Sequence, residues 1–575
     1  MNRVLTADDG KRWNWGASAL LTAFVMTVPT LVVILLGGST AGAPLVWVRT
    51  AMAGFRQETS TPEVMIQSSF VLTFASKRSA GPDDFSFPYT STRTVHDRLH
   101  GGLLAAGFDQ EACHSRYQSA MYRRNPGRRP SEHLVSKLRR HEALQRRCGP
   151  GTAAYSSALE QLKSGKNAGA SPADPDCRYL VSISYRGLGN RILAAASAFL
   201  YALLTDRVLL VDSSNEMGEL FCEPFPDTTW LLPWRSFPLW NFSFDTQERY
   251  GRMRENGVLR TNDDVGSSSP AEVVPPAFAY IHLDYNHTAY DQLFFCDDDQ
   301  RLLSSFQWLV MRTDSYIAPG LFLVESFQEE LDMLFPEREA VFHHLGRYLF
   351  HPTNHVWGLI TRYYRANLAW AQRRVGIQVR VFPWEPDSPE LLERITKCTQ
   401  EEGMLPGLVE TEEPAAAATT ASGAKSNAVL ITSLKAWYYE QMKGMYWENA
   451  TANGEVVVVN QPSHEEYQHY GVKSHEYKAW AEIYLLSLTD MLVTTGKSTF
   501  GYVAQGLAGL RPWVLLKQAN GTAGHGWCSR DMSLEPCFHI APSYDCKRRH
   551  DSGEIVPHVR HCEDVPTGLK LVDPN

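Results

Sequence analysis

Short apolar strands alternate with helices over two stretches of this 575-residue chain. Such alternation is typical of parallel sheets whose faces are covered by helices, so we expect an α/β protein with two doubly wound units. The first unit begins at Cys177, and the second begins near residue 371. The predicted strands are residues 179–184 and 207–212 in the first unit and 375–382, 428–433, 456–459, 491–494 and 513–516 in the second; the predicted helices are 192–204, 357–370 and 477–488.

An uncharged run of 21 residues, 16–36, precedes both units. As a helix this run would span roughly 30 Å, the thickness of one hydrocarbon core. Arg3, Lys11 and Arg12 come before it and the next basic residue is Arg49, which favours a cytosolic amino terminus. The alternative is a cleaved signal peptide, whose apolar region is usually shorter. We therefore expect a cytosolic tail at 1–15 and a transmembrane anchor at 16–37.

Cysteines and glycosylation sequons indicate that the rest of the chain lies in the secretory lumen. All ten cysteines follow the anchor, an even number that suits disulfides. The last four cysteines contain no C-x-x-C pair, which favours disulfides over zinc, although the connectivity is not readable. Four N-x-[S/T] sequons also follow the anchor, at Asn241, Asn286, Asn449 and Asn520.

Composition divides the luminal part further. Residues 38–93 are rich in Ser, Thr, Pro and Gly and predict a stem. The basic segment 98–166 is expected to be helical with a solvated face, the alternative being a site for lipid or an anionic polymer. We interpret the low-complexity stretch at 408–427 as a surface loop within the second unit and not as a domain border. The border is instead placed near residue 370, after the predicted helix 357–370. The net charge of −8 argues against a nucleic-acid partner.

Three segments carry candidate ligand-binding residues. SYRGLGNR, residues 184–191, is a Gly-x-Gly turn between a strand and a helix, but it lacks the third glycine of a dinucleotide fingerprint. Arg380 stands near the carboxyl end of an apolar strand, where either an anionic ligand or a structural salt bridge would pair with it. Residues 489–507 place Lys497, Ser498 and Thr499 at a helix start, either as a phosphate cradle or as an ordinary N-cap.

Two other segments suggest metal sites. Asp297, Asp298 and Asp299 follow an apolar run, and a D-x-D at a strand end holds a divalent ion in metal-dependent sugar transferases. The hypothesis of a metal site at these aspartates competes with the hypothesis of a phosphate site at Lys497, Ser498 and Thr499 in the second unit. A histidine cluster at 343–351 lacks nearby carboxylates and is better explained as a helix that supports the site.

Several long strings resemble the plant xyloglucan fucosyltransferase family, glycosyltransferase family 37. They are SYRGLGNRILAAASAFLYALLTDRVLLVD, LFCEPFPDTTWLLP, FHHLGRYLFHPTNHVWGLITRYY, VGIQVRVF, SLTDMLVTTGKSTFGYVAQGLAGLRPW and PHVRHCED, and the resemblance covers residues 97–572. It implies a Golgi type II membrane protein with a GT-B-like fold, in which two Rossmann-like domains face a cleft. It further implies an acceptor-side domain at 94–370 and a GDP-fucose-binding domain at 371–575.

The implied reaction is transfer of L-fucose from GDP-fucose to O-2 of a galactose on a cell-wall polysaccharide, most directly xyloglucan, with inversion. The implied enzyme is a galactoside 2-alpha-L-fucosyltransferase that needs no metal and no other cofactor. Its implied partners are the donor, the galactosylated acceptor, the Golgi membrane, and a second copy or other Golgi glycosyltransferases. Alternatives are transfer to arabinogalactan or another wall glycan, a UDP-sugar transferase using Mn²⁺, and a catalytically silent carbohydrate-binding scaffold.

By the resemblance, Arg380 is the arginine that contacts the GDP diphosphate. The other residues implied at the donor site are Gly189, Asn190, Arg191, Asp490, Ser498, Thr499 and Phe500. The physics agrees, because a preorganised guanidinium and a helix N-terminus both stabilise the negative charge on departing GDP. The base is not identified by the resemblance. Asp314 and His344 are the candidates, each of which could instead only orient the acceptor.

Overall fold

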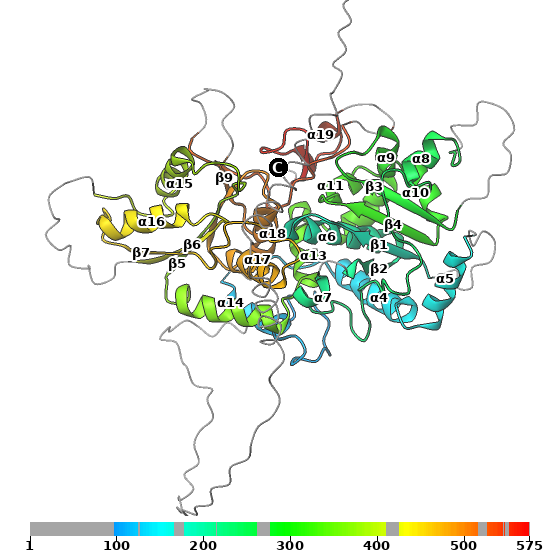
Figure 1. Ribbon diagram of the computed structural model, residues 1–575, viewed down its shortest axis with the longest axis horizontal. Helices are drawn as coiled ribbons and strands as arrows, with labels where there is room; N and C mark the ends of the chain where they lie inside the picture. Colours follow the sequence, from blue (N-terminus) through cyan, green and yellow to red (C-terminus); the bar gives the residue numbers. More distant parts are fainter. Residues whose placement is uncertain are drawn as a thin grey trace, which may run out of the picture. The chain divides into compact units, whose positions relative to one another are not determined.

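Two parallel sheets carry most of the apolar strands (Figure 1). The computed structural model describes residues 97–124, 127–165, 177–213, 216–261, 276–409, 425–515, 526–543, 546 and 551–573. The predicted tail, membrane anchor and stem lie outside these residues, as does most of the predicted loop at 408–427. The α/β class with parallel sheets is confirmed.

The first sheet has four parallel strands in the order β2-β1-β4-β3. Its side chains alternate between two apolar layers, as a pleated strand requires. Tyr179 and Val181 share an apolar cluster with Tyr155 of α5 (Ala153–Lys163), while Leu180 faces the core that contains α6 (Leu188–Thr205). The strands are β1 (Tyr179–Ile183), β2 (Val208–Val211), β3 (Phe278–Leu283) and β4 (Trp308–Thr313), of which β1 and β2 were predicted.

The second sheet has six strands in the order β10-β9-β8-β5-β6-β7, parallel except for β10. Val375 and Ile377 face α15 (Pro389–Glu401) and α16 (Trp437–Glu448), and Leu430 faces α17 (Lys473–Leu486). Five of its strands fall where they were predicted, but β5 ends at Gln378 rather than at residue 382. The strands are β5 (Arg373–Gln378), β6 (Ser426–Thr432), β7 (Val456–Asn460), β8 (Met491–Thr495), β9 (Trp513–Leu515) and β10 (Ser529–Arg530).

Helices α6, α13, α17 and α18 pack against one another between the two sheets (Figure 1). They share one apolar core with strands of both sheets. Helix α6 is long and apolar enough to cross a membrane, but it is buried in this core and is a core helix. The bounds are α6 (Leu188–Thr205), α13 (Val341–Leu349), α14 (Asn354–Asn367), α15 (Pro389–Glu401), α16 (Trp437–Glu448), α17 (Lys473–Leu486) and α18 (Thr499–Ala508).

The remaining α-helices of the described residues lie outside this group of four. They are α3 (His114–Tyr122), α4 (Glu132–Cys148), α5 (Ala153–Lys163), α7 (Met217–Leu220), α8 (Tyr250–Glu255), α9 (Ala289–Gln292), α10 (Asp297–Ser304), α11 (Ala318–Leu321), α12 (Gln328–Leu334) and α19 (Ser552–Ile555). The expectation of a solvated basic face at 98–166 is wrong for its central residues. Arg123 donates to the carbonyls of Ser487 and Leu507, and Arg128 pairs with Glu337 and Glu339, so these cations hold distant segments together.

The C-terminal segment returns from the second sheet to the first half of the chain. Its hairpin of β11 (Val559–His561) and β12 (Leu569–Leu571) contacts α11, and Cys546 is bonded to Cys296. All ten cysteines form disulfides, which confirms disulfides over zinc; the other pairs are Cys113–Cys222, Cys148–Cys177, Cys398–Cys528 and Cys537–Cys562. The sequon residues Asn241, Asn286 and Asn449 are exposed, and Asn520 lies outside the described residues.

Candidate functional site

A cavity of about 620 Å³ lies where the carboxyl ends of β5, β6 and β8 meet the amino ends of α6 and α18. Open α/β sheets bind ligands at this position, because loops at the strand ends and free helix N–H groups converge there. Residues on both sides of the predicted border at 370 line it. The lining residues on which the argument below mainly depends are Arg186, Gly189, Asn190, Tyr285, Arg380, Phe382, Ser463, Glu482, Lys497, Thr499, Phe500 and His539.

Arg380 lies on the cavity wall, two residues beyond β5. The ladder ends here because the backbone N–H of Arg380 donates to the side-chain hydroxyl of Thr495, the last residue of β8, at 2.8 Å and not to a backbone carbonyl. The guanidinium carbon lies 4.6 Å from the centre of the Phe382 ring. Partial burial lowers the pKa of Arg380, which stays far above neutrality in any protein. Within the described ranges it makes no ion pair, so the structural salt bridge weighed from the sequence is not seen.

The loop before α18 presents the residues predicted to cradle a phosphate. Lys497 has a left-handed backbone (φ 63°), and Lys497, Thr499 and Phe500 line the cavity. Ser498 is buried and caps α18, accepting a hydrogen bond from the N–H of Gly501 at 3.3 Å. Ser498 is therefore an ordinary N-cap, whereas its neighbours Lys497 and Thr499 line the cavity.

The glycine turn of the first half meets this loop directly. A Cβ on Gly189 would lie 2.8 Å from the carbonyl carbon of Thr499, so only glycine permits the approach. Asn190 accepts from the Thr499 hydroxyl at 3.1 Å and donates to the backbone oxygen of Asp314 at 2.7 Å. Arg191 forms a buried pair with Glu476 of α17 at 2.5 Å, so it joins α6 to α17.

The two candidate bases are both buried and absent from the cavity wall. Asp314 follows β4, accepts hydrogen bonds from Ser184, Tyr185 and Arg186, and pairs with the Arg186 guanidinium at 3.3 Å. Burial lowers the pKa of His344, in α13, to about 3. Both residues support the polypeptide around the cavity.

Asp490 also lies off the cavity wall. It precedes β8, at the end of the sheet opposite Arg380, and pairs with Arg374 at 2.9 Å and Arg124 at 3.1 Å. The motif that suggested it is continuous in sequence, but β8 separates Asp490 from the loop at Lys497 by the length of a strand.

Glu482 and His539 are two of the ionisable residues on the cavity wall that were not predicted as site residues from the sequence. Glu482 lies on α17, where burial raises its pKa to about 8 and the Ser463 hydroxyl donates to it. Its signal was a carboxylate within the apolar string AEIYLL. His539 belongs to the C-terminal segment, and the sequence around it contains no motif that indicates a site residue.

The hypothesis of a metal site at Asp297–Asp299 required these aspartates to follow a strand, but the structure has no strand directly before them within the described range 276–409. The preceding run is a 3₁₀ turn, Leu293–Phe295, and the three aspartates occupy the first turn of α10. Asp297 accepts the backbone N–H groups of Glu325 and Ser326, and Asp299 accepts from Tyr250 and Arg254. These carboxylates are occupied by structural contacts away from the main cavity.

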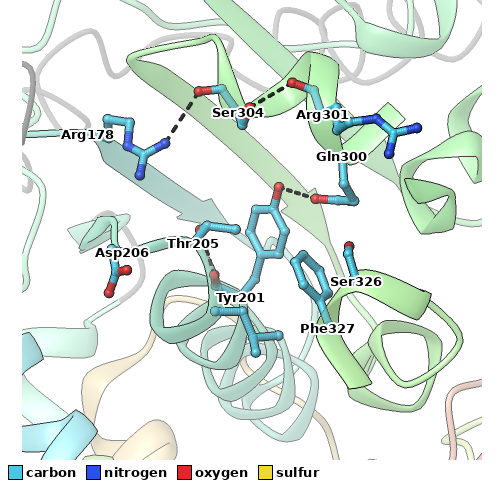
Figure 2. A pocket seen from close by; sticks show the side chains of 10 residues that line it. Arg178, Tyr201, Thr205, Asp206, Gln300, Arg301, Ser304, Ser326 and Phe327 are labelled. Atoms are coloured by element: carbon cyan, nitrogen blue, oxygen red, sulfur yellow. Dashed lines mark hydrogen bonds between the residues drawn. The ribbon is translucent and has the colours of Figure 1, made fainter. Parts of the chain in front are cut away.

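A smaller cavity of about 240 Å³ lies beside α10 (Figure 2). The Tyr201 hydroxyl donates to Gln300 at 2.8 Å, and Figure 2 shows this bond together with Arg178 directed at the carbonyl of Ser304. None of the predicted site residues lines it. In the part of the chain that the structure describes, the one cluster with metal-ligand geometry is Cys537, Cys562 and Asp564, whose cysteines are bonded to each other.

Comparison with known proteins identifies the family. The xyloglucan fucosyltransferase profile matches residues 73–547. A galactoside 2-alpha-L-fucosyltransferase of Pisum sativum is 49% identical over 513 residues, covering 88% of this chain and 87% of that protein. Fucosyltransferase 2 of Arabidopsis thaliana is 47% identical over 540 residues, covering 92% and 97%.

A solved structure agrees with these sequence matches. The structure of an Arabidopsis thaliana FUT1 mutant in complex with GDP is 48% identical, with a TM-score of 0.73, and covers 83% of this chain and all of that one. The profile spans both sheets and all the cavity-lining residues named above, and the two relatives align with 88% and 92% of the chain. The chain therefore belongs to the xyloglucan fucosyltransferase family.

Proposed function

We propose that this protein is an inverting fucosyltransferase that moves L-fucose from GDP-fucose to O-2 of a galactose on a cell-wall polysaccharide, xyloglucan being the acceptor. The observation that carries the proposal is Arg380, a cation without an ion pair in the described residues, in a 620 Å³ cavity at the amino ends of two helices. Departure of GDP places negative charge on the β-phosphate, and a guanidinium and free N–H groups stabilise it. The similar FUT1 structure holds GDP.

Glu482 supports guanine as the base of the donor. Guanine presents two adjacent donors, N1–H and the N2 amino group, and a carboxylate accepts both at once. Glu482 is buried in the cavity wall and makes no ion pair in the described ranges, whereas its neighbour Glu465 is paired with His475 and Lys478. Among nucleotide sugars, this favours a GDP-sugar over a UDP-sugar.

The acceptor would enter beside the first sheet. Arg186 and Tyr285 line that side of the cavity, and the guanidinium carbon of Arg186 lies 4.8 Å from the Tyr285 ring centre. At the other rim Trp384 is exposed and stacks on Phe382 at 4.6 Å. Exposed aromatic faces of this kind pack against pyranose rings. Arabinogalactan is the alternative acceptor, and a silent scaffold is disfavoured because such a protein needs no diphosphate site.

The proposed reaction needs no metal ion, since Arg380 and the two helix N-termini supply the positive charge. The proposed setting is the Golgi membrane, with the GT-B-like catalytic domains in the lumen on a single-pass type II anchor. A second copy of the chain or other Golgi glycosyltransferases are its proposed protein partners.

The test is a transfer assay with the full-length chain in detergent-solubilised membranes. It uses GDP-fucose, EDTA, and either galactosylated xyloglucan, arabinogalactan or buffer, with products analysed by mass spectrometry. We expect a fucose mass on xyloglucan alone. Transfer to arabinogalactan alone would show that arabinogalactan, and not xyloglucan, is the acceptor. Loss of transfer in EDTA that Mn²⁺ restores would contradict the metal-free mechanism. Failure to consume GDP-fucose would favour the silent scaffold.

A further inference from the structure

We propose that His539 is the base that takes the proton of the attacking hydroxyl, and that Tyr502 and Asp564 position it. This inference rests on the proposed function and deepens it, since neither candidate base from the sequence reaches the cavity wall. His539 does line the cavity, together with Lys497, Thr499 and Val565.

A chain of hydrogen bonds assigns the tautomer of His539. Asp564 Oδ2 accepts from the backbone N–H of Lys497 at 2.7 Å and from the Tyr502 hydroxyl at 2.5 Å. The single hydroxyl proton of Tyr502 is thereby used, so the 3.2 Å contact between Tyr502 Oη and His539 Nε2 requires Nε2 to donate. A neutral imidazole that donates from Nε2 carries a lone pair on Nδ1.

That lone pair is available to a reactant. No residue that the structure describes hydrogen-bonds to His539 Nδ1, whereas Nε2 is fixed by Tyr502. The Asp564 carboxylate thus orients the imidazole through the Tyr502 hydroxyl. Other catalytic sites likewise use a buried acid to orient the base through a hydrogen bond. Tyr502 belongs to the first turn of α18, so the chain of bonds starts at the loop predicted to hold the diphosphate.

The disulfide Cys537–Cys562 anchors both ends of this arrangement. His539 follows Cys537 by two positions, and Asp564 follows Cys562 by two positions. The disulfide therefore fixes the segments carrying His539 and Asp564 relative to each other. It gives the site the rigidity that a base requires, since misplacement by about 1 Å costs on the order of 10²-fold in rate.

The proposed step balances atoms and charge. The galactose oxygen forms a bond to C1 of fucose as the bond between C1 and the phosphate oxygen breaks, and GDP leaves with that electron pair. The hydroxyl proton passes to Nδ1 of His539. The resulting imidazolium is stabilised through Tyr502 by the Asp564 carboxylate, and its proton then leaves to solvent.

The charges around His539 agree with a neutral resting state. Lys497 of the donor loop and Lys570 of β12 face it as cations, and Asp564 faces it as an anion. Burial is the largest influence and lowers the pKa of His539, with the two lysines acting in the same direction. The free base is therefore the form present at neutral pH, and activity falls when the pH drops through this lowered pKa.

The experiment compares full-length wild type, His539→Gln and the matched control His561→Gln, which changes a histidine of the same segment that pairs with Asp551 off the cavity. We expect His539→Gln to lower kcat for fucosyl transfer by about 10²-fold or more, to abolish the acid limb of the pH profile of kcat, and to keep the Kd for GDP within about twofold. His561→Gln should match wild type. Transfer by His539→Gln within about threefold of wild type, or an unchanged acid limb, overturns the proposal.

If His539→Gln no longer binds GDP, a second variant, Tyr502→Phe, tests the proposal. Tyr502→Phe removes the hydroxyl that accepts from Nε2, so kcat should fall and the acid limb should move to lower pH as the imidazolium loses its stabilising partner. An acid limb at the wild-type position in Tyr502→Phe overturns the proposal. Wild-type protein that transfers no fucose to any acceptor would instead contradict the proposed function, so the two failures are distinguishable.

Discussion

Removal of the Arg380 guanidinium tests the proposed charge contact between this residue and the donor. Arg380→Ala should lower transfer by about 10²-fold or more, because one preorganised donor to a developing oxyanion contributes about 3–4 kcal/mol. Its thermal midpoint should stay close to wild type, since Arg380 makes no ion pair within the described residues. Steady-state kinetics and thermal unfolding give the two readouts. Arg301→Ala, at an exposed arginine paired with Asp298, is the control, and near-normal transfer by Arg380→Ala would contradict the assignment.

The proposed contact between Glu482 and guanine predicts that donor binding depends on pH. Burial raises the pKa of Glu482 to about 8, so the free protein holds it neutral at pH 7, whereas pairing with guanine requires the carboxylate. Binding then releases a proton, and affinity for GDP should rise about tenfold per pH unit up to pH 8 and level off above it. Calorimetry on wild type and Glu482→Gln measures this, with Glu440→Gln on the exposed face of α16 as control. Equal slopes in wild type and Glu482→Gln would exclude a guanine contact.

At the scale of single residues, the sequence located those contacts that belong to a pattern. Arg380, Asn190 and Thr499 stand at strand ends and helix starts, and the cavity brings all three together. His539 was missed because its position depends on a disulfide, whose pairing is not readable from spacing. Asp490 was misleading for the opposite reason, because it belongs to the right motif but lies at the far end of β8 from the cavity.

The contact between the amino ends of α6 and α18 is the element-scale feature that closes the cavity. Gly189→Ala would place a methyl group 2.8 Å from the Thr499 backbone, and neither helix end can yield as a flexible side chain would. We expect a higher KM for the donor and a fall in kcat/KM of at least about tenfold, with secondary structure by circular dichroism retained. Gly407→Ala, at a site open within 4 Å, is the control. Unchanged donor kinetics in Gly189→Ala would show that this approach does not shape the site.

Element prediction succeeded where periodicity was strong. The strands of the second sheet except β10 and the helix α17 lie within a few residues of their predicted bounds. Strand β3 was missed because it lies beyond a long polar stretch with no paired helix signal. The predicted strand at 375–382 was too long because the backbone N–H of Arg380 bonds to Thr495, a side-chain contact that an apolar pattern does not encode.

At the scale of the whole molecule, the C-terminal segment joins the halves of the chain. Cys546 bonds to Cys296, and the buried Glu535 accepts from Tyr316 and from the backbone N–H of Phe342, both at 2.7 Å. The same segment carries His539 and Asp564 to the cavity. The catalytic arrangement therefore requires an oxidised chain, which agrees with the compartment that the sequence predicts.

The predicted membrane orientation has a direct test in intact microsomes. If residues 38–575 face the lumen, added protease should spare them until detergent opens the vesicles, and glycosidase should increase the gel mobility of the chain. The exposed sequons at Asn241, Asn286 and Asn449 are the expected carriers, so replacing all three with Gln should remove most of that mobility change. Digestion of the catalytic part in closed vesicles would reverse the orientation. It would also place the five disulfides in a reducing compartment, where glutathione keeps most cysteines as thiols and the segment carrying His539 would lose its anchor.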